Sequence, residues 1–235
     1  MSIYHLHIPR TAGIYLSQNV VPYLISNRVE HFASNRTVID PEKIKNSKFV
    51  SGHFGLMPLE YMQDPEVFTV LRNPVERFIS YFNYTTGLIR TRSEAHQKLD
   101  NWLYGEQSLV QSNMQSKFLT GYMNYEKFNQ GVNQFQNAVY NSWFIENYSL
   151  DKDTIKANID KFNVFTMEDY DLFLELFNDK LEKDFGFRTF RHKDKSNSST
   201  DIGIKFSKSQ INKIEELNSI DMEMYEYVQK NKKRY

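Results

Sequence analysis

The N-terminal segment contains the feature that most constrains the fold of this chain. Residues 3–8 form an apolar strand candidate that Pro9 ends, and Arg10 with small residues after it makes a basic turn. Helical periodicity follows over residues 13–26, within which Pro22 predicts a kink or an early end. A strand, a tight turn and a helix start leave unpaired backbone N–H groups and a partial positive charge at one point. We therefore expect a phosphate- or sulfate-binding turn, to which Arg10 adds a planar fork of donors.

Strand and helix patterns alternate along the rest of the chain. Strands are predicted at residues 48–51, 66–71 and 162–167, and helices from 74 onward, over much of 93–150, over 172–181 and over 207–230. Such alternation predicts a parallel sheet with helices on both faces. Because no internal repeat or long linker divides the chain, we expect a single domain over residues 1–235.

Three polar residues stand just past the ends of predicted strands. Arg10 follows the first strand, His53 the second and Arg72 the third. Ligands of parallel α/β sheets bind at the carboxyl ends of the strands. We therefore expect these three side chains to converge on one crevice.

The charge balance and the composition exclude several classes of protein. Lys and Arg total 29, as do Asp and Glu, and this zero net charge argues against nucleic-acid binding by charge alone. The absence of cysteine excludes disulfides and thiolate metal sites. Because the chain has no apolar run of about 18 residues and no signal-peptide pattern, we expect no membrane span and a cytoplasmic location.

Short segments, in order along the first half of the chain, carry a resemblance to a known family. Residues 7–15 (HIPRTAGIY) are similar to the 5′-phosphosulfate loop of sulfotransferases, which in the carbohydrate branch usually has the sequence HIPKTAGTS. Residues 70–81 (VLRNPVERFISY) resemble the 3′-phosphate motif RDPxxRxxS, residues 51–54 (SGHF) resemble the family's Gly-His element, and residues 113–121 are a weaker match. The chain therefore resembles the sulfotransferases that use 3′-phosphoadenosine 5′-phosphosulfate (PAPS), in particular the heparan sulfate 2-O-like carbohydrate branch.

The resemblance implies a fold, a donor and a reaction. The implied fold is a P-loop-like three-layer α/β sandwich with a central parallel sheet. The implied reaction is in-line transfer of the sulfuryl group from PAPS to an acceptor hydroxyl of a carbohydrate or a small molecule, with 3′-phosphoadenosine 5′-phosphate (PAP) as the product. It requires no metal and no nucleic-acid partner. A lipid head group and a tyrosine are further acceptors that the sequence leaves open.

The resemblance also assigns roles to individual residues. Arg10 and the backbone N–H groups of the residues after it would stabilise the charge that grows on the leaving phosphate. Those residues are Thr11, Ala12, Gly13, Ile14 and Tyr15. Arg72 and Ser80, about two helical turns apart, would bind the 3′-phosphate. His53 would be the base, because an imidazole accepts a proton near neutral pH as the acceptor hydroxyl attacks.

The chain departs from the family pattern in its first loop. Arg10 replaces the usual lysine, and Ile14 and Tyr15 replace two hydroxyl residues, so side-chain donors to the 5′-phosphate are lost. We expect weaker donor binding or compensation from other cations and amides. The candidates are Lys117 and a polar loop with Lys193, Lys195 and Asn197.

Two other functions remain open. One is a kinase-like nucleotide-dependent transferase on the same scaffold, although the chain lacks the GxxxxGK[ST] loop. The other is a non-catalytic relative that binds PAP, which the changes at Ile14 and Tyr15 favour. Among the other polar residues, we expect His5 and His7 to line the crevice rather than bind a metal, and Arg77 to pair with an acid.

Overall fold

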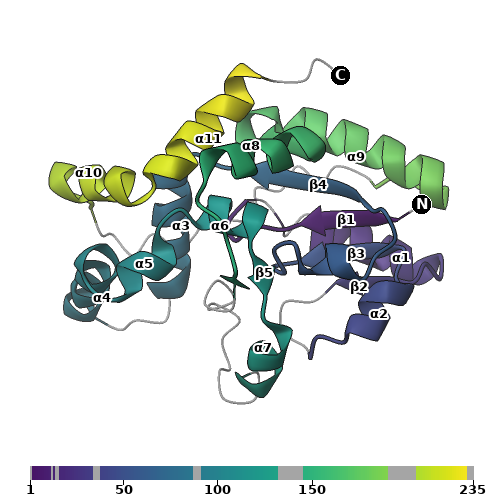
Figure 1. The fold of residues 1–235 in the computed structure, drawn as a ribbon, viewed down its shortest axis with the longest axis horizontal. Helices are drawn as coiled ribbons and strands as arrows, with labels where there is room; N and C mark the ends of the chain where they lie inside the picture. Colours follow the sequence, from purple (N-terminus) through teal and green to yellow (C-terminus); the bar gives the residue numbers. More distant parts are fainter. Residues whose placement is uncertain are drawn as a thin grey trace.

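The centre of the molecule is a sheet of five parallel strands (Figure 1). The computed structural model describes residues 2–11, 13, 16–33, 38–86, 91–131, 145–189 and 205–231. The strands are β1 (Ile3–Leu6), β2 (His31–Ala33), β3 (Phe49–Gly52), β4 (Glu66–Leu71) and β7 (Asn163–Thr166). Their order across the sheet is β2-β3-β1-β4-β7, so β1 lies between β3 and β4. The predicted α/β class with a central parallel sheet is confirmed.

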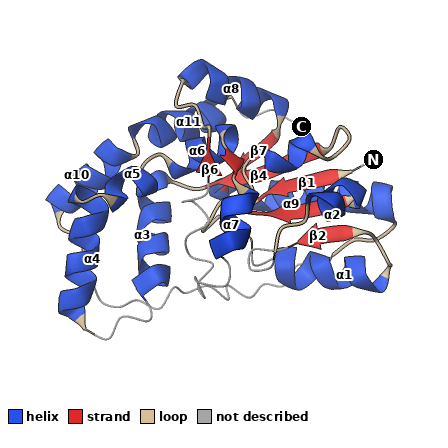
Figure 2. Cartoon of the chain, turned by 60° about the horizontal axis from the view of Figure 1, so that its bottom comes forward, coloured by secondary structure: helices blue, strands red, loops and turns tan. Residues whose placement is uncertain are grey.

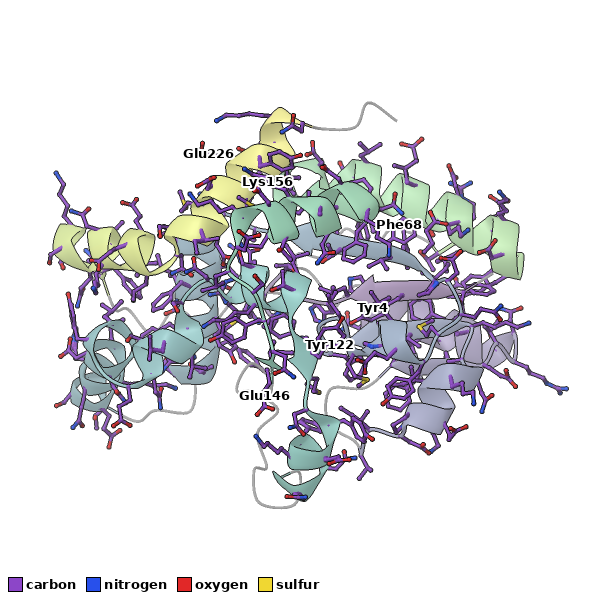
Figure 3. The ribbon with its side chains drawn as sticks, viewed as in Figure 1. Tyr4, Phe68, Tyr122, Glu146, Lys156 and Glu226 are labelled. Atoms are coloured by element: carbon purple, nitrogen blue, oxygen red, sulfur yellow. The ribbon has the colours of Figure 1, made fainter. Side chains whose placement is uncertain are left out.

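Helices cover both faces of the sheet because side chains alternate along each strand. On β1, Ile3 packs into one hydrophobic cluster and Tyr4 into the other, and both are fully buried. One face carries η1 (Leu16–Val20), α1 (Val21–Ser26) and α9 (Tyr170–Phe185). The other carries α2 (Pro41–Asn46), α6 (Met114–Thr120), α8 (Lys152–Lys161) and α11 (Ser219–Lys230), and the buried side of α3 (Pro74–Thr86) joins the same hydrophobic cluster. The molecule therefore has three layers. In the outer layer α8 packs against α11, and Figure 3 labels Lys156 on α8 and Glu226 on α11.

A group of helices extends the molecule beyond one end of the sheet, at the left in Figures 1 and 2. It consists of α3, α4 (Arg92–Tyr104), α5 (Gln107–Gln111) and α10 (Lys208–Leu217). Trp102 is buried at its centre, where its ring lies 5.5 to 5.6 Å from the rings of Phe78, Tyr81 and Phe82. This aromatic packing ties α4 to α3, the helix that follows β4.

Shorter elements complete the fold. They are η2 (Met57–Glu60), α7 (Tyr125–Gly131), η4 (Met167–Asp169) and a small antiparallel pair, β5 (Tyr122–Met123) with β6 (Ile145–Glu146). Tyr122 and Glu146, labelled in Figure 3, are partners in that pair. Every helix in the described part of the chain is too short or too polar to cross a bilayer.

Three details differ from the predicted elements. The predicted first helix is a π-helix followed by α1, and the change falls next to Pro22, which occupies the first turn of α1. The predicted helix over 207–230 is two helices, because the buried Asn218 side chain donates to the Ile214 carbonyl and accepts from the Asn113 backbone N–H. The three-residue strand β2 was missed because it is too short to show alternation.

Candidate functional site

The carboxyl edge of the sheet brings the predicted polar residues to neighbouring strands. Arg10 lies four residues beyond the end of β1, His53 directly follows β3 and Arg72 directly follows β4. From β1 the chain passes to α1 on one face, whereas from β4 it passes to α3 on the other. This change of face is a topological switch point, the place where parallel α/β sheets bind ligands.

Arg10 reaches from the first loop to helix α3. Its Nε atom donates a hydrogen bond of 3.0 Å to the Ser80 hydroxyl, and the centre of its guanidinium lies 4.9 Å from the centroid of the Tyr84 ring. Its backbone φ is 73°, a left-handed conformation that costs energy for a residue with a side chain. Burial lowers the pKa of Arg10, the nearby Tyr84 opposes this, and the charge of Arg72 lowers it further. The first loop and the second motif are therefore in direct contact.

Arg72 is fixed through its backbone and leaves its side chain partly exposed. The Gln115 side chain accepts from the Arg72 N–H and donates to the Arg72 carbonyl, both at 2.9 Å. The Gln115 N–H in turn donates to the buried carboxylate of Asp221, which caps the start of α6. The Arg72 guanidinium pairs with Glu76 at 3.3 Å, one turn along α3, in a surface contact of the kind that contributes little stability. The end of β4 is thus held firmly while its cation remains available to a ligand.

Ser80 and Tyr84 are one helical turn apart on α3, so they share a face. Ser80 is buried and Tyr84 is 45% exposed, so the face leads from the interior to solvent. Thr11 differs from its neighbour Arg10, because its buried hydroxyl donates to the Ile8 carbonyl at 2.8 Å.

Three histidines form a row beside Arg10. The ring of His7 stacks on His5 at 5.4 Å and lies 4.4 Å from the ring of His53, and His5 Nδ1 lies 2.8 Å from the Ser51 hydroxyl. His7 also explains the glycine in the first loop. A Cβ atom on Gly13 would lie 1.9 Å from the His7 ring, so a side chain there would require the ring to move.

The histidine row is uncharged at neutral pH. Burial lowers the pKa of His7 to about 4, with a further contribution from the positive charge of Arg10. Burial also lowers the pKa of His53 well below its usual value, and His7 and His5 add to this effect. The row therefore presents neutral imidazoles at the carboxyl edge, each a weaker base than a free imidazole. Among the described residues, no group of three His, Cys, Asp or Glu side chains has the arrangement of a metal site.

The loop that carries His53 is tightly packed. A Cβ on Gly52 would lie 2.3 Å from the Phe54 ring, and one on Gly55 would lie 2.2 Å from the Gly121 carbonyl oxygen. The buried Tyr4 hydroxyl donates to the Gly55 carbonyl at 2.6 Å. These contacts fix the backbone on both sides of His53.

Lys117 does not join this group. Its ammonium donates to the Leu109 carbonyl, lies 3.4 Å from the Ser112 hydroxyl and lies 5.1 Å from the centroid of the Tyr148 ring. Burial lowers its pKa to about 8. Its ammonium therefore helps α5 to pack against α6. In this conformation Lys117 does not supply the donor that we expected it to add at the first loop.

Arg77 lies beneath the site and is fully buried. Burial lowers its pKa, and the nearby Asp221 carboxylate opposes this shift. Its Nη1 atom lies 3.0 Å from the Met114 sulfur, and the described residues include no direct ion pair between Arg77 and an acid. The expected pairing is therefore an interaction of charges at a distance. The remaining predicted residues lie outside the described part of the chain: Ala12, Ile14, Tyr15, Lys193, Lys195 and Asn197.

Tyr84 is the site residue that the motifs missed. Its position four residues after Ser80 was the available signal, because residues with this spacing share a helix face. The fold and the edge together define an α/β protein with a partly buried pair of arginines at the switch point of a parallel sheet. No protein-family model matches the chain, and no match was found among curated proteins.

Proposed function

We propose that the protein is a PAPS-dependent sulfotransferase with a P-loop-like α/β fold. One observation carries the proposal: the Arg10–Ser80 hydrogen bond joins the two segments that resemble the phosphate-binding motifs of that family. These segments are 70 residues apart in sequence. The parallel sheet brings the two segments to the same edge, and the hydrogen bond adds a direct side-chain contact between them.

The polar side chains at the carboxyl edge of the sheet suit an anionic sulfuryl donor such as PAPS. Arg72 is close enough for its charge to act on Arg10, and the Ser80 hydroxyl lies within hydrogen-bond distance of Arg10. Guanidinium groups bind phosphate oxygens with two parallel hydrogen bonds. The geometry thus supplies the charge and the hydroxyl that a bis-phosphorylated nucleotide requires.

His53 is the proposed base. PAPS would supply an activated sulfuryl group whose bond to the 5′-phosphate oxygen breaks with the electron pair left on that oxygen. As the acceptor oxygen forms its bond to sulfur, His53 takes the hydroxyl proton, for which it must be neutral. The lowered pKa of His53 keeps it neutral through the physiological range. The acceptor is a hydroxyl of a carbohydrate or a small molecule, and a cytoplasmic location is part of the same proposal.

Replacement of the base tests this assignment. In His53→Ala we expect transfer from labelled PAPS to fall by at least about a hundredfold, because general bases contribute factors of that size. PAP affinity, measured by calorimetry, should stay within about twofold of the parent value, because His53 is not among the residues proposed to bind the phosphates. Normal turnover by His53→Ala would show that His53 is not the base.

A second candidate is a protein that binds PAP without transferring sulfate. The sequence change at Ile14 and Tyr15, which removes two hydroxyl donors, favours it. An acceptor screen with labelled PAPS separates the two functions, because any sustained sulfate transfer by the parent protein that is lost in His53→Ala excludes the binding-only function.

A further inference from the structure

The start of α6 and the start of α11 cap each other, although 106 to 108 positions separate the bonded residues. The Asp221 carboxylate of α11 accepts from the Gln115 N–H at 2.9 Å. In return, the Asn113 side chain accepts from the N–H groups of Ile220 and Asp221, both at 3.1 Å. We propose that this reciprocal cap holds Arg72 in place for the donor nucleotide, so that Gln115 and Asp221 are positioning residues. The inference rests on the proposed function and on the assignment of Arg72 to the 3′-phosphate.

The backbone of Arg72 lies just beyond the sheet. The ladder between β4 and β7 ends with the pair of Leu71 and Thr166, one residue before Arg72. The Gln115 side chain continues it, because its oxygen accepts from the Arg72 N–H and its amino group donates to the Arg72 carbonyl, both at 2.9 Å. One side chain from α6 therefore satisfies both backbone groups of Arg72, as a residue of a neighbouring strand would.

The direction of the Arg72 side chain depends on this backbone anchor. Its guanidinium donates from Nε and Nη2 to Glu76, both at 3.3 Å, and the Glu76 side chain is exposed. A long surface contact of this kind holds a flexible side chain weakly. A shift of the Arg72 backbone would therefore carry the guanidinium with it, and a binding group displaced by about 1 Å loses much of its effect.

The reciprocal cap is rigid because it is buried and its polar groups are satisfied. Gln115, Ser116, Asn218 and Asp221 are at most 1% exposed. The Asp221 carboxylate also accepts from the Ser116 N–H at 2.7 Å and from the Ser116 hydroxyl at 2.6 Å. Burial raises the pKa of Asp221, whereas the bonds from Ser116 and Gln115 and the charge of Arg77 oppose this shift. A satisfied buried network specifies one arrangement of its members, so α11 fixes Gln115 and, through it, the end of β4.

Gln115→Met tests the anchor, because methionine has a similar length and can make neither bond to the Arg72 backbone. We expect affinity for PAP to fall about fivefold or more, part of what a charge-assisted hydrogen bond contributes. Affinity for adenosine 5′-phosphate, which lacks the 3′-phosphate, should change by less than about twofold. Calorimetry with the two nucleotides measures both values.

The Arg72→Gln background separates positioning from general stability. With the guanidinium removed, Gln115→Met has no cation left to misplace, so we expect it to cause no further loss of PAP affinity. Its effect on the unfolding temperature should persist in that background. A purely structural role for Gln115 would lower PAP affinity by the same factor with and without the Arg72 guanidinium.

Asp221→Asn acts one step further from Arg72 and changes the shape of the side chain little. An amide replaces one accepting oxygen by a donor, which then faces an N–H group at the start of α6. We expect PAP affinity to fall by roughly two- to fivefold, less than in Gln115→Met because the effect is indirect. The loss should vanish in the Gln115→Met background.

Asn158→Leu is the matched control. The Asn158 side chain of α8 donates to the Leu119 carbonyl at 2.8 Å, near the other end of α6. Its removal should lower the unfolding temperature and leave PAP affinity within about twofold of the parent value. Circular dichroism identifies the variants that are folded, and Gln115→Met and Asp221→Asn each test the inference alone.

The contrary results are distinct. Parent-like PAP affinity in a folded Gln115→Met protein, or an equal loss of PAP and adenosine 5′-phosphate affinity, would overturn the inference and leave the proposed function intact. So would a loss in Asn158→Leu as large as that in Gln115→Met, because it would show that any loosening of α6 weakens binding. Failure of the parent protein to bind PAP would overturn the proposed function as well.

Discussion

Charged side chains gather at both edges of the central sheet, and the two groups are built differently. At the amino edge, Lys180 of α9 lies 2.6 Å from Glu66 and 3.2 Å from Asp184, and Glu66 also accepts from Asn163. One cation there meets two carboxylates. At the carboxyl edge, the charge of Arg72 acts on Arg10, and among the described residues one carboxylate, the exposed Glu76, pairs with Arg72.

The two groups of charges therefore have different roles. The cation at the amino edge stabilises the fold, whereas the cations at the carboxyl edge can bind a ligand. A buried cation between two acids has its hydrogen bonds satisfied within the protein. Two arginines that pair with a single surface acid, within the residues that the structure describes, have donors left over. The comparison therefore predicts that the amino edge governs stability and the carboxyl edge governs binding.

Protonation of the three histidines has the largest expected effect on stability. It adds positive charge to the carboxyl edge, where positive charge is already in excess. The pKa of His7 is about 4 in the folded protein and about 6.5 when unfolded, so the unfolded state binds more protons between these values. The free energy of unfolding should therefore be at its maximum above pH 6.5. It should fall as the pH drops towards 4, by about 1.4 kcal/mol per pH unit from His7 alone.

Urea unfolding at several pH values measures this fall. The groups that face His7 are His5, His53 and Arg10, and protonation of His5 or His53 would steepen the slope. His7→Asn should flatten the curve between pH 4 and 6.5. A slope that is the same with and without His7 would contradict the assignment.

Removal of the amino-edge cation comes next in size. Lys180→Met leaves Glu66 and Asp184 without their shared partner, so we expect the free energy of unfolding to fall by about 2–3 kcal/mol. PAP affinity should stay at the parent value. Lys183→Met, an exposed neighbour on α9, is the control. Loss of PAP binding without loss of stability would reverse the comparison.

A methyl group on Gly13 tests the packing of the first loop. In Gly13→Ala the new Cβ would lie 1.9 Å from the His7 ring, so we expect a loss of at least about 1 kcal/mol in unfolding free energy and weaker PAP binding. The same change in a His7→Ala background should cost less, because the obstructing ring is gone. Equal costs in both backgrounds would show that His7 does not determine the need for glycine.

The smallest effect on stability is expected for Arg10 at the carboxyl edge. Arg10→Gln removes one hydrogen bond and one ring contact but also relieves the repulsion from Arg72. The free energy of unfolding should change by less than about 0.5 kcal/mol, far less than in Lys180→Met. Thermal denaturation of the two variants side by side measures the contrast. A large loss in Arg10→Gln would mean that Arg10 serves the fold.

The sequence predicted those elements that local patterns encode. The β-branched and aromatic run at residues 66–71 coincides with β4, and Pro74 with Glu76 marks the start of α3. Because parallel strands end at one edge, the prediction that Arg10, His53 and Arg72 follow strand ends placed them at the same edge of the sheet, and their convergence on one crevice stays a prediction.

Other features depend on contacts between distant residues and had no local signal. The Arg10–Ser80 bond, for example, joins residues 70 positions apart. The break at Asn218 depends on its contact with Asn113, 105 residues earlier. The local pattern indicates which residues are available for the site, and the tertiary contacts determine which of them meet.

A crystal structure of the protein with PAP tests the central claim most directly. The account predicts PAP at the carboxyl edge of the sheet, with its phosphates within hydrogen-bond distance of Arg10, Arg72 and Ser80. A nucleotide bound elsewhere, or a 3′-phosphate that contacts none of these three side chains, would contradict it.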